Sequence, residues 1–140
     1  MRNFTTVVLC CLLMVVTSSF PAHSQTVFKK ALQKKHDFKS VSCTACHLKG
    51  KDANGKALGK EHRNAFGEAI YKLLADKEVT KRIKEAKKAG LDAKKKVNEE
   101  VTQEFLEALS TVEEMPSQEE GSTWGELLRE GKLEGVKVKK

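Results

Sequence analysis

Apolar residues recur along much of the chain at intervals of three and four, the spacing that places side chains on one face of an α-helix. The clearest stripe follows Asn64, a residue type that commonly caps helix N-termini. Its members are Phe66, Ala69, Ile70, Leu73 and Leu74. We therefore expect an amphipathic helix that begins directly after Asn64.

Four further segments have helical patterns, and the residues between them are mostly polar. The first is Phe28–His36, and the second contains Val79, Ile83 and Ala86 and ends at Gly90. The third is longer, starts at about Asp92 and contains Val97, Val101, Phe105, Leu109 and Val112. The last is Trp124–Arg129, capped by Thr123. Residues 48–63 are expected to form a loop, and residues 116–122 a polar linker before the last helix. The only strand signal is Val136 and Val138, in a basic tail expected to fray. The predicted fold class is all-α.

The N-terminal residues are organised like a secretory signal peptide. Met1–Asn3 is short and positive, residues 7–16 are uninterruptedly apolar, and residues 17–24 are mostly small and end in Ala22-His23-Ser24. Ten apolar residues are too few to span a bilayer as a permanent helix. We expect cleavage of residues 1–24 and export to the periplasm or the medium, which leaves residues 25–140 as a single domain. The alternative is an uncleaved anchor.

Charge is distributed unevenly over this domain. Residues 25–98 carry 20 basic and 8 acidic side chains, whereas residues 99–140 carry 5 basic and 11 acidic ones. The stretch Lys77–Lys96 is the most basic, and it is either a solvated helical face or a docking surface for an acidic partner or an anionic membrane. Nucleic acid is not expected as a partner, because no aromatic residues interleave with these lysines.

After signal cleavage the chain keeps two cysteines, both in Cys43-Thr44-Ala45-Cys46-His47. This C-x-x-C-H spacing is that of haem attachment, since two thiols one turn apart can each add to a haem vinyl group and the next histidine can bind the iron. Either Ser40 or Ser42 is expected to cap the turn. We predict one covalent haem c on Cys43 and Cys46, with His47 as an axial ligand.

Other uses of the motif are a redox dithiol, a disulfide or a zinc site. A redox C-x-x-C normally lies beside a βαβ pattern, which this sequence lacks. Structural zinc needs a fourth ligand, which only His36 or His62 could supply.

With this motif the chain resembles the c-type cytochromes. Arg63–Gly67 resembles the N-x-F-G element that follows C-x-x-C-H in many exported bacterial haem proteins. Residues 123–133 resemble the closing segment of small exported proteins with one such motif. The resemblance implies a small helical cytochrome c-like domain, with about four to five helices wrapped on one haem.

The sixth iron ligand is left open by the sequence. Met115 is the only methionine after the signal segment and, as in small class I cytochromes, it comes late in the chain. His62 lies in the 48–63 loop, and His36 precedes the motif. The shorter loop to His47 slightly favours His62, because closing a short loop costs less chain entropy. An open sixth position is the remaining alternative.

The expected function is therefore single-electron transfer between redox partners by an exported monohaem cytochrome, and we do not expect an enzyme, since no acid–base pair is evident. Two alternatives remain: a haem enzyme or gas-binding sensor with an open sixth site, and a zinc- or disulfide-stabilised interaction module. The expected partners are acidic redox proteins, with an anionic membrane surface as a second candidate.

Overall fold

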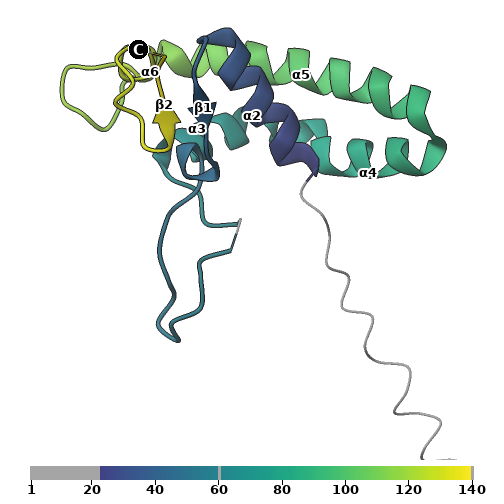
Figure 1. Ribbon diagram of the computed structural model, residues 1–140, viewed down its shortest axis with the longest axis horizontal. Helices are drawn as coiled ribbons and strands as arrows, with labels where there is room; N and C mark the ends of the chain where they lie inside the picture. The colour runs from purple at the N-terminus through teal and green to yellow at the C-terminus, as the bar shows by residue number, and fades with distance from the viewer. Residues whose placement is uncertain (1–22, 60, 140) are drawn as a thin grey trace, which may run out of the picture.

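The computed structural model of the protein describes residues 23–59 and 61–139 (Figure 1). The elements of this part are α2 His23–Lys35, β1 Ser40–Val41, the 3₁₀ turn η1 Cys43–Ala45, α3 Ala65–Leu74, the 3₁₀ turn η2 Ala75–Lys77, α4 Val79–Ala89, α5 Leu91–Glu113, α6 Trp124–Arg129 and β2 Val136–Lys137. Only the last two residues of the predicted signal segment 1–24 fall within the described residues. No helix in the described ranges is long and apolar enough to cross a membrane.

The 23-residue helix α5 is the centre of the fold, because α2, α3, α4 and α6 all pack against it. Its apolar stripe is buried over the C-terminal half of the helix, from Val101 to Val112. Phe28 of α2 stacks on Phe105 with ring centroids 4.5 Å apart. Helix α4 runs back along α5 as a hairpin whose connection lies at one end of the molecule, away from β1, β2 and α6 (Figure 1).

The core at the other end joins residues from nearly every element. Ala45 of η1, Phe66 of α3 and Leu128 of α6 are almost completely buried there with the C-terminal half of α5. Phe66 and Trp124 contact each other with ring centroids 5.5 Å apart. The turn that carries the cysteines is therefore part of the core through Ala45, not an appendage to it.

Helix boundaries follow the predicted caps closely. The Asn64 side chain accepts a hydrogen bond from the backbone N–H of Gly67, and Thr123 forms a reciprocal capping box with Glu126. The first helix begins at His23 and not at Phe28, since Val27 and Phe28 both pack against the Val79–Ile83–Val101 cluster. The predicted linker 116–122 is a compact loop closed by pairing of Pro116 with Thr123.

The C-terminal tail corrects one expectation, because residues 136 and 137 do not fray. They form β2, which pairs antiparallel with β1 so that Val136 lies opposite Val41 and Lys137 opposite Ser40. Both valines are buried, and their burial stabilises a pairing that lies far apart in sequence. The fold is thus mainly helical with one small two-stranded sheet, and not strictly all-α.

Candidate functional site

The residues Cys43–His47 form one tight helical turn. The backbone N–H groups of Cys46 and His47 both donate to the carbonyl of Cys43, at 3.2 and 3.0 Å. Ser42 occupies the N-cap position, but its hydroxyl contacts the Thr44 hydroxyl at 2.6 Å and caps no backbone group. Ser40, the other candidate cap, belongs to β1. The turn therefore places the two cysteines about one helical turn apart, as the sequence spacing predicts.

Helix α3 braces this turn through Asn64. Besides capping α3, its side-chain amide donates to the carbonyls of Thr44 and Ala45, both at 3.0 Å. The backbone N–H of Asn64 donates to the carbonyl of Cys46 at 3.1 Å. One side chain thus joins the start of α3 to the backbone between the two cysteines, and a different side chain could not make the same set of bonds.

Gly67 allows the close approach of α3 to the motif. A Cβ atom at this position would lie 2.7 Å from the carbonyl carbon of Cys46 and 2.9 Å from its Cα atom, and closer still to its oxygen. Since real Cβ contacts are rarely under 3.4 Å, only glycine fits without moving the backbone. The spacing of asparagine and glycine in residues 63–67 therefore has a physical explanation in this structure. Asn64 donates hydrogen bonds to the motif, and Gly67 leaves room for the Cys46 backbone.

The C-terminal tail braces the motif from another side. The backbone N–H of Ser42, the residue after β1, donates to the carbonyl of Gly135, the residue before β2, at 2.7 Å. Gly135 has φ +79°, and a Cβ atom there would lie 2.7 Å from the backbone nitrogen of Ala45. This contact could not be predicted from the sequence, because a glycine in a charged tail gives no sign of a partner about ninety residues away.

His47 is paired with Arg63 across a short antiparallel bridge. The hydrogen bonds that flank the pair run from Asn64 N–H to Cys46 and from Leu48 N–H to His62, so His47 and Arg63 themselves form a non-hydrogen-bonded pair. Side chains of such a pair lie on the same face. The Arg63 guanidinium lies 3.6 Å from the ring centroid of Tyr71 on α3, which adds a cation–π contact beside His47.

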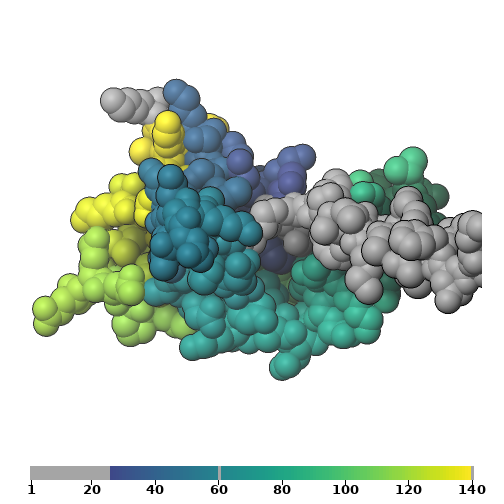
Figure 2. All heavy atoms as spheres, turned by 90° about the horizontal axis from the view of Figure 1, so that it is seen from below, coloured from purple at the N-terminus to yellow at the C-terminus, as the bar shows by residue number. Residues whose placement is uncertain are grey.

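The residues between this pair form the predicted loop, which projects from the helical body (Figure 1). Seen from below, it stands forward of the body between the C-terminal segment and α4 (Figure 2). A second bridge, between Lys51 and Ala57, narrows it. Lys49, Lys51 and Lys56 are exposed on it, so the segment that follows the motif in the sequence presents positive charge to solvent.

The two thiols and the imidazole have environments that fit covalent haem. Cys43 is exposed, Cys46 is partly exposed, and both are free thiols. Burial of its sulfur, followed by the neighbouring Cys43, raises the pKa of Cys46 to about 12. Redox dithiols have lowered thiol pKa values, so this environment is unlike theirs. Nδ1 of His47 is buried in the protein, which leaves Nε2 as the nitrogen able to reach an iron atom.

Of the three candidates for the sixth ligand, His36 and Met115 make other contacts, and His62 faces away from His47. His62 lies opposite Leu48, and since neighbouring residues of a strand alternate between faces, its side chain is on the other face of the bridge from His47. Met115 packs against the main core, and its backbone bonds to Val112 and Trp124. His36 contacts the Glu113 carboxylate at 2.8 Å and stacks on Phe38. The structure brings none of them over His47.

Within the described part of the chain, no three His, Cys, Asp or Glu side chains converge as a possible metal site. Two surface depressions lie along α5, and neither is lined by motif residues. Comparisons with models of protein families, with curated proteins and with solved structures found no match.

Proposed function

We propose that the protein is an exported monohaem c-type cytochrome that carries single electrons between partner proteins. The observation that carries the proposal is the Cys43–His47 turn, which holds two free thiols and an imidazole in the order that haem attachment requires. The bracing of this turn by Asn64, Gly67 and Gly135 supports it further. A rigid turn keeps the histidine and both thioether sulfurs in one geometry during oxidation and reduction.

When bound, haem c supplies a one-electron change between ferric and ferrous iron. Cys43 and Cys46 would hold the porphyrin through thioether bonds, and His47 would hold the iron through Nε2. Nδ1 of His47 is buried, so the protein groups around it, and not solvent, would set the orientation of the ring and the strength of the ligand. Arg63, on the same face as His47, places a positive charge next to the site.

The test is to produce the chain together with a haem-attachment system. Haem should remain on the protein during denaturing electrophoresis, and the intact mass should equal residues 25–140 plus one haem. The paired variant Cys43→Ala/Cys46→Ala should lose the colour, whereas Ser42→Ala should keep it. Colourless wild-type protein that carries zinc would instead favour the interaction module, and a mass two hydrogens below the sum of the residues would favour a disulfide.

A second candidate function, gas binding at an open sixth position, is favoured because His36 and Met115 make other contacts and the His62 side chain faces away from His47. Ligation by His62 would require the 47–63 pair to open, and ligation by Met115 would require the end of α5 to leave Trp124. If the position is open, carbon monoxide should bind the reduced protein rapidly, and His62→Ala and Met115→Leu should leave the spectrum unchanged. A spectrum altered by one of these substitutions identifies that residue as the ligand and supports electron transfer.

The proposed partners are acidic redox proteins, which positive charge near the haem would attract. The exposed lysines of the 48–63 loop follow the motif directly in the sequence, whereas the basic stretch Lys77–Lys96 begins at the end of η2 and continues over α4 and the start of α5. Electrons pass only over short distances, so the loop is the better placed of the two for a redox partner.

A further inference from the structure

The connection between α4 and α5 forms a basic tip, residues 87–96, at the end of the molecule away from the sheet and α6 (Figure 1). Its charged residues are five lysines and one aspartate: Lys87, Lys88, Lys94, Lys95, Lys96 and Asp92. All of these except Lys94 are exposed. The sequence alone gives this charge, but only the fold shows that it is gathered at an apex and not spread along one helix.

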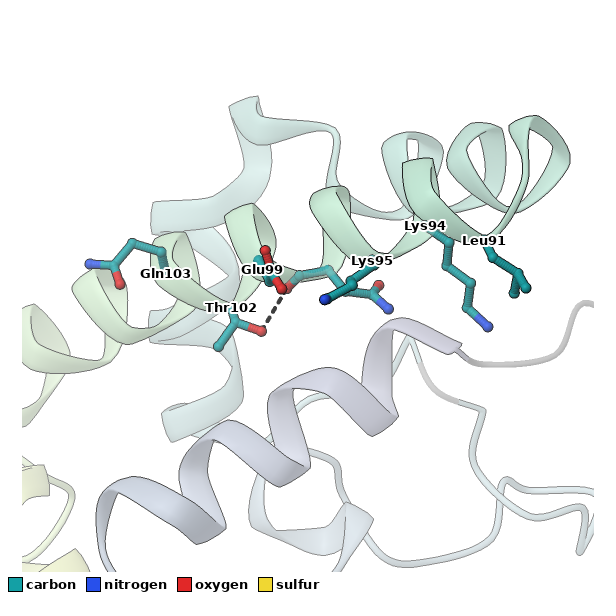
Figure 3. Close-up of a pocket in the computed structure, with 7 residues that line it drawn as sticks. Leu91, Lys94, Lys95, Glu99, Thr102 and Gln103 are labelled. Carbon is teal, nitrogen blue, oxygen red and sulfur yellow. Dashed lines mark hydrogen bonds between the residues drawn. The ribbon is translucent and has the colours of Figure 1, made fainter.

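Leu91 is at the centre of the tip and has a solvent-exposed fraction of 84 %. No other large apolar side chain among the described residues is as exposed. Gly90, with φ +118°, makes the sharp connection that leaves Leu91 in the first turn of α5. Leu91 and Lys94 project from the same side of that turn (Figure 3). Proteins bind the membrane interface by combining apolar side chains that enter the boundary between headgroups and acyl chains with lysines that attract anionic lipids. Leu91 and the lysines around it offer both on a small scale.

A depression of about 440 Å³ between α2 and α5 extends the basic surface from the tip. Lys30, Lys34 and Lys94 line it, together with Asn98 and Thr102, and no acidic residue does. Ammonium groups and polar side chains of this kind suit a phosphate group. The basic tip therefore combines an apolar residue for the acyl boundary with a neighbouring surface for anionic headgroups.

We propose that the basic tip docks the protein on an anionic lipid membrane, with Leu91 inserted at the headgroup level and the lysines in contact with lipid phosphates. A convex apex with one apolar residue fits a soft bilayer better than a protein surface, which would need a matching hollow. Docking in this orientation leaves the Cys43–His47 end directed away from the lipid and accessible to a partner. The inference needs only the fold and does not depend on bound haem.

The experiment is co-sedimentation of the full mature protein with vesicles, scored by protein and not by haem colour. Phosphatidylcholine vesicles containing phosphatidylglycerol should bind the protein, vesicles of phosphatidylcholine alone should not, and added salt should weaken binding. Leu91→Ala should lower the partition constant about tenfold, as expected for partial loss of one buried leucine. Replacing Lys88, Lys94 and Lys95 by Gln should lower it on the order of a hundredfold, at about fivefold for each lysine.

Two matched controls separate the tip from general charge and hydrophobicity. Replacing Lys49, Lys51 and Lys56 by Gln removes the same charge from the 48–63 loop, and Val138→Ala shortens another exposed apolar residue. Both should bind vesicles like the wild type. Absence of binding to anionic vesicles overturns the proposal, and so does equal loss in the loop variant. If the protein binds polyglutamate as tightly as vesicles, and Leu91→Ala does not weaken that binding, the tip would instead suit an acidic protein partner. This result would also overturn the proposal.

Discussion

Replacing Gly67 by alanine is the most direct test of how the motif is held. Gly67 is in the first turn of α3 and has an ordinary helical backbone, so alanine should by propensity stabilise the helix by about 1 kcal/mol. The added Cβ, however, would lie 2.7 Å from the Cys46 carbonyl carbon. Carbon atoms prefer separations of about 3.5–4.0 Å, so α3 and the motif must separate by roughly 1 Å.

That movement would weaken the three hydrogen bonds from Asn64 to the motif, two from its side chain and one from its backbone N–H, each worth about 1 kcal/mol. The gain in helix propensity offsets part of this cost, and looser packing of Phe66 adds to it. We therefore expect the free energy of unfolding to fall by about 2–3 kcal/mol. Urea unfolding followed by far-ultraviolet circular dichroism would measure this loss. The yield of covalent haem per chain, measured on the same preparations, should fall as well, because the motif backbone is displaced.

Gly125→Ala is the matched control. Its Cβ would lie 2.9 Å from the carbonyl oxygen of Glu113, a milder overlap between α6 and α5 that involves no motif residue. It should cost about 1 kcal/mol and leave haem attachment unchanged. If Gly67→Ala is as stable as the wild type and takes up haem equally well, the close approach of α3 does not organise the motif, and the reasoning is refuted.

Three further predictions concern other parts of the structure. Asn64→Asp keeps a cap for α3 but replaces the amide donor to the two motif carbonyls by a carboxylate, so urea unfolding should show a loss of about 1–2 kcal/mol; an unchanged midpoint would contradict the bracing role. Arg82→Lys removes the paired hydrogen bonds that join α4 to Glu104 and Glu100 on α5, and thermal unfolding should show a loss of about 1 kcal/mol, with Lys81→Arg as the unaffected control. The last prediction compares two triple variants: one carries Glu in place of the loop lysines Lys49, Lys51 and Lys56, and the other carries Glu in place of the tip lysines Lys87, Lys88 and Lys95. In stopped-flow assays, electron transfer to an acidic partner should slow more in the loop variant than in the tip variant. Equal slowing of the two variants would count against docking at the loop.

Elements governed by neighbouring residues could be predicted from the sequence. The start of α3 follows from Asn64 and the apolar stripe behind it, and the short helix α6 follows from Thr123 with Glu126 three residues later. In both cases the decisive hydrogen bonds join residues within one helical turn. The same is true of the motif, whose turn is set by bonds to the Cys43 carbonyl.

Contacts between distant residues could not be predicted in this way. The pairing of Val41 with Val136, and of His47 with Arg63, depends on which segments the packed helices bring together, and two-residue strands are too short to show alternation. The candidate ligands His36 and Met115 were reasonable by residue type and spacing. Their actual partners, Glu113 and the main core, lie on elements whose positions the sequence pattern does not specify.

The bond from Ser42 to Gly135 has a consequence for the timing of maturation. A chain made from its N-terminus presents Cys43–His47 long before residues 133–137 exist, and the core around Ala45 also awaits α5 and α6. Until those residues are present, the motif lacks its bond to Gly135 and the core contacts of Ala45, although its local turn can already form. An attachment enzyme would then reach the two cysteines more easily than after the C-terminal segment has packed against them.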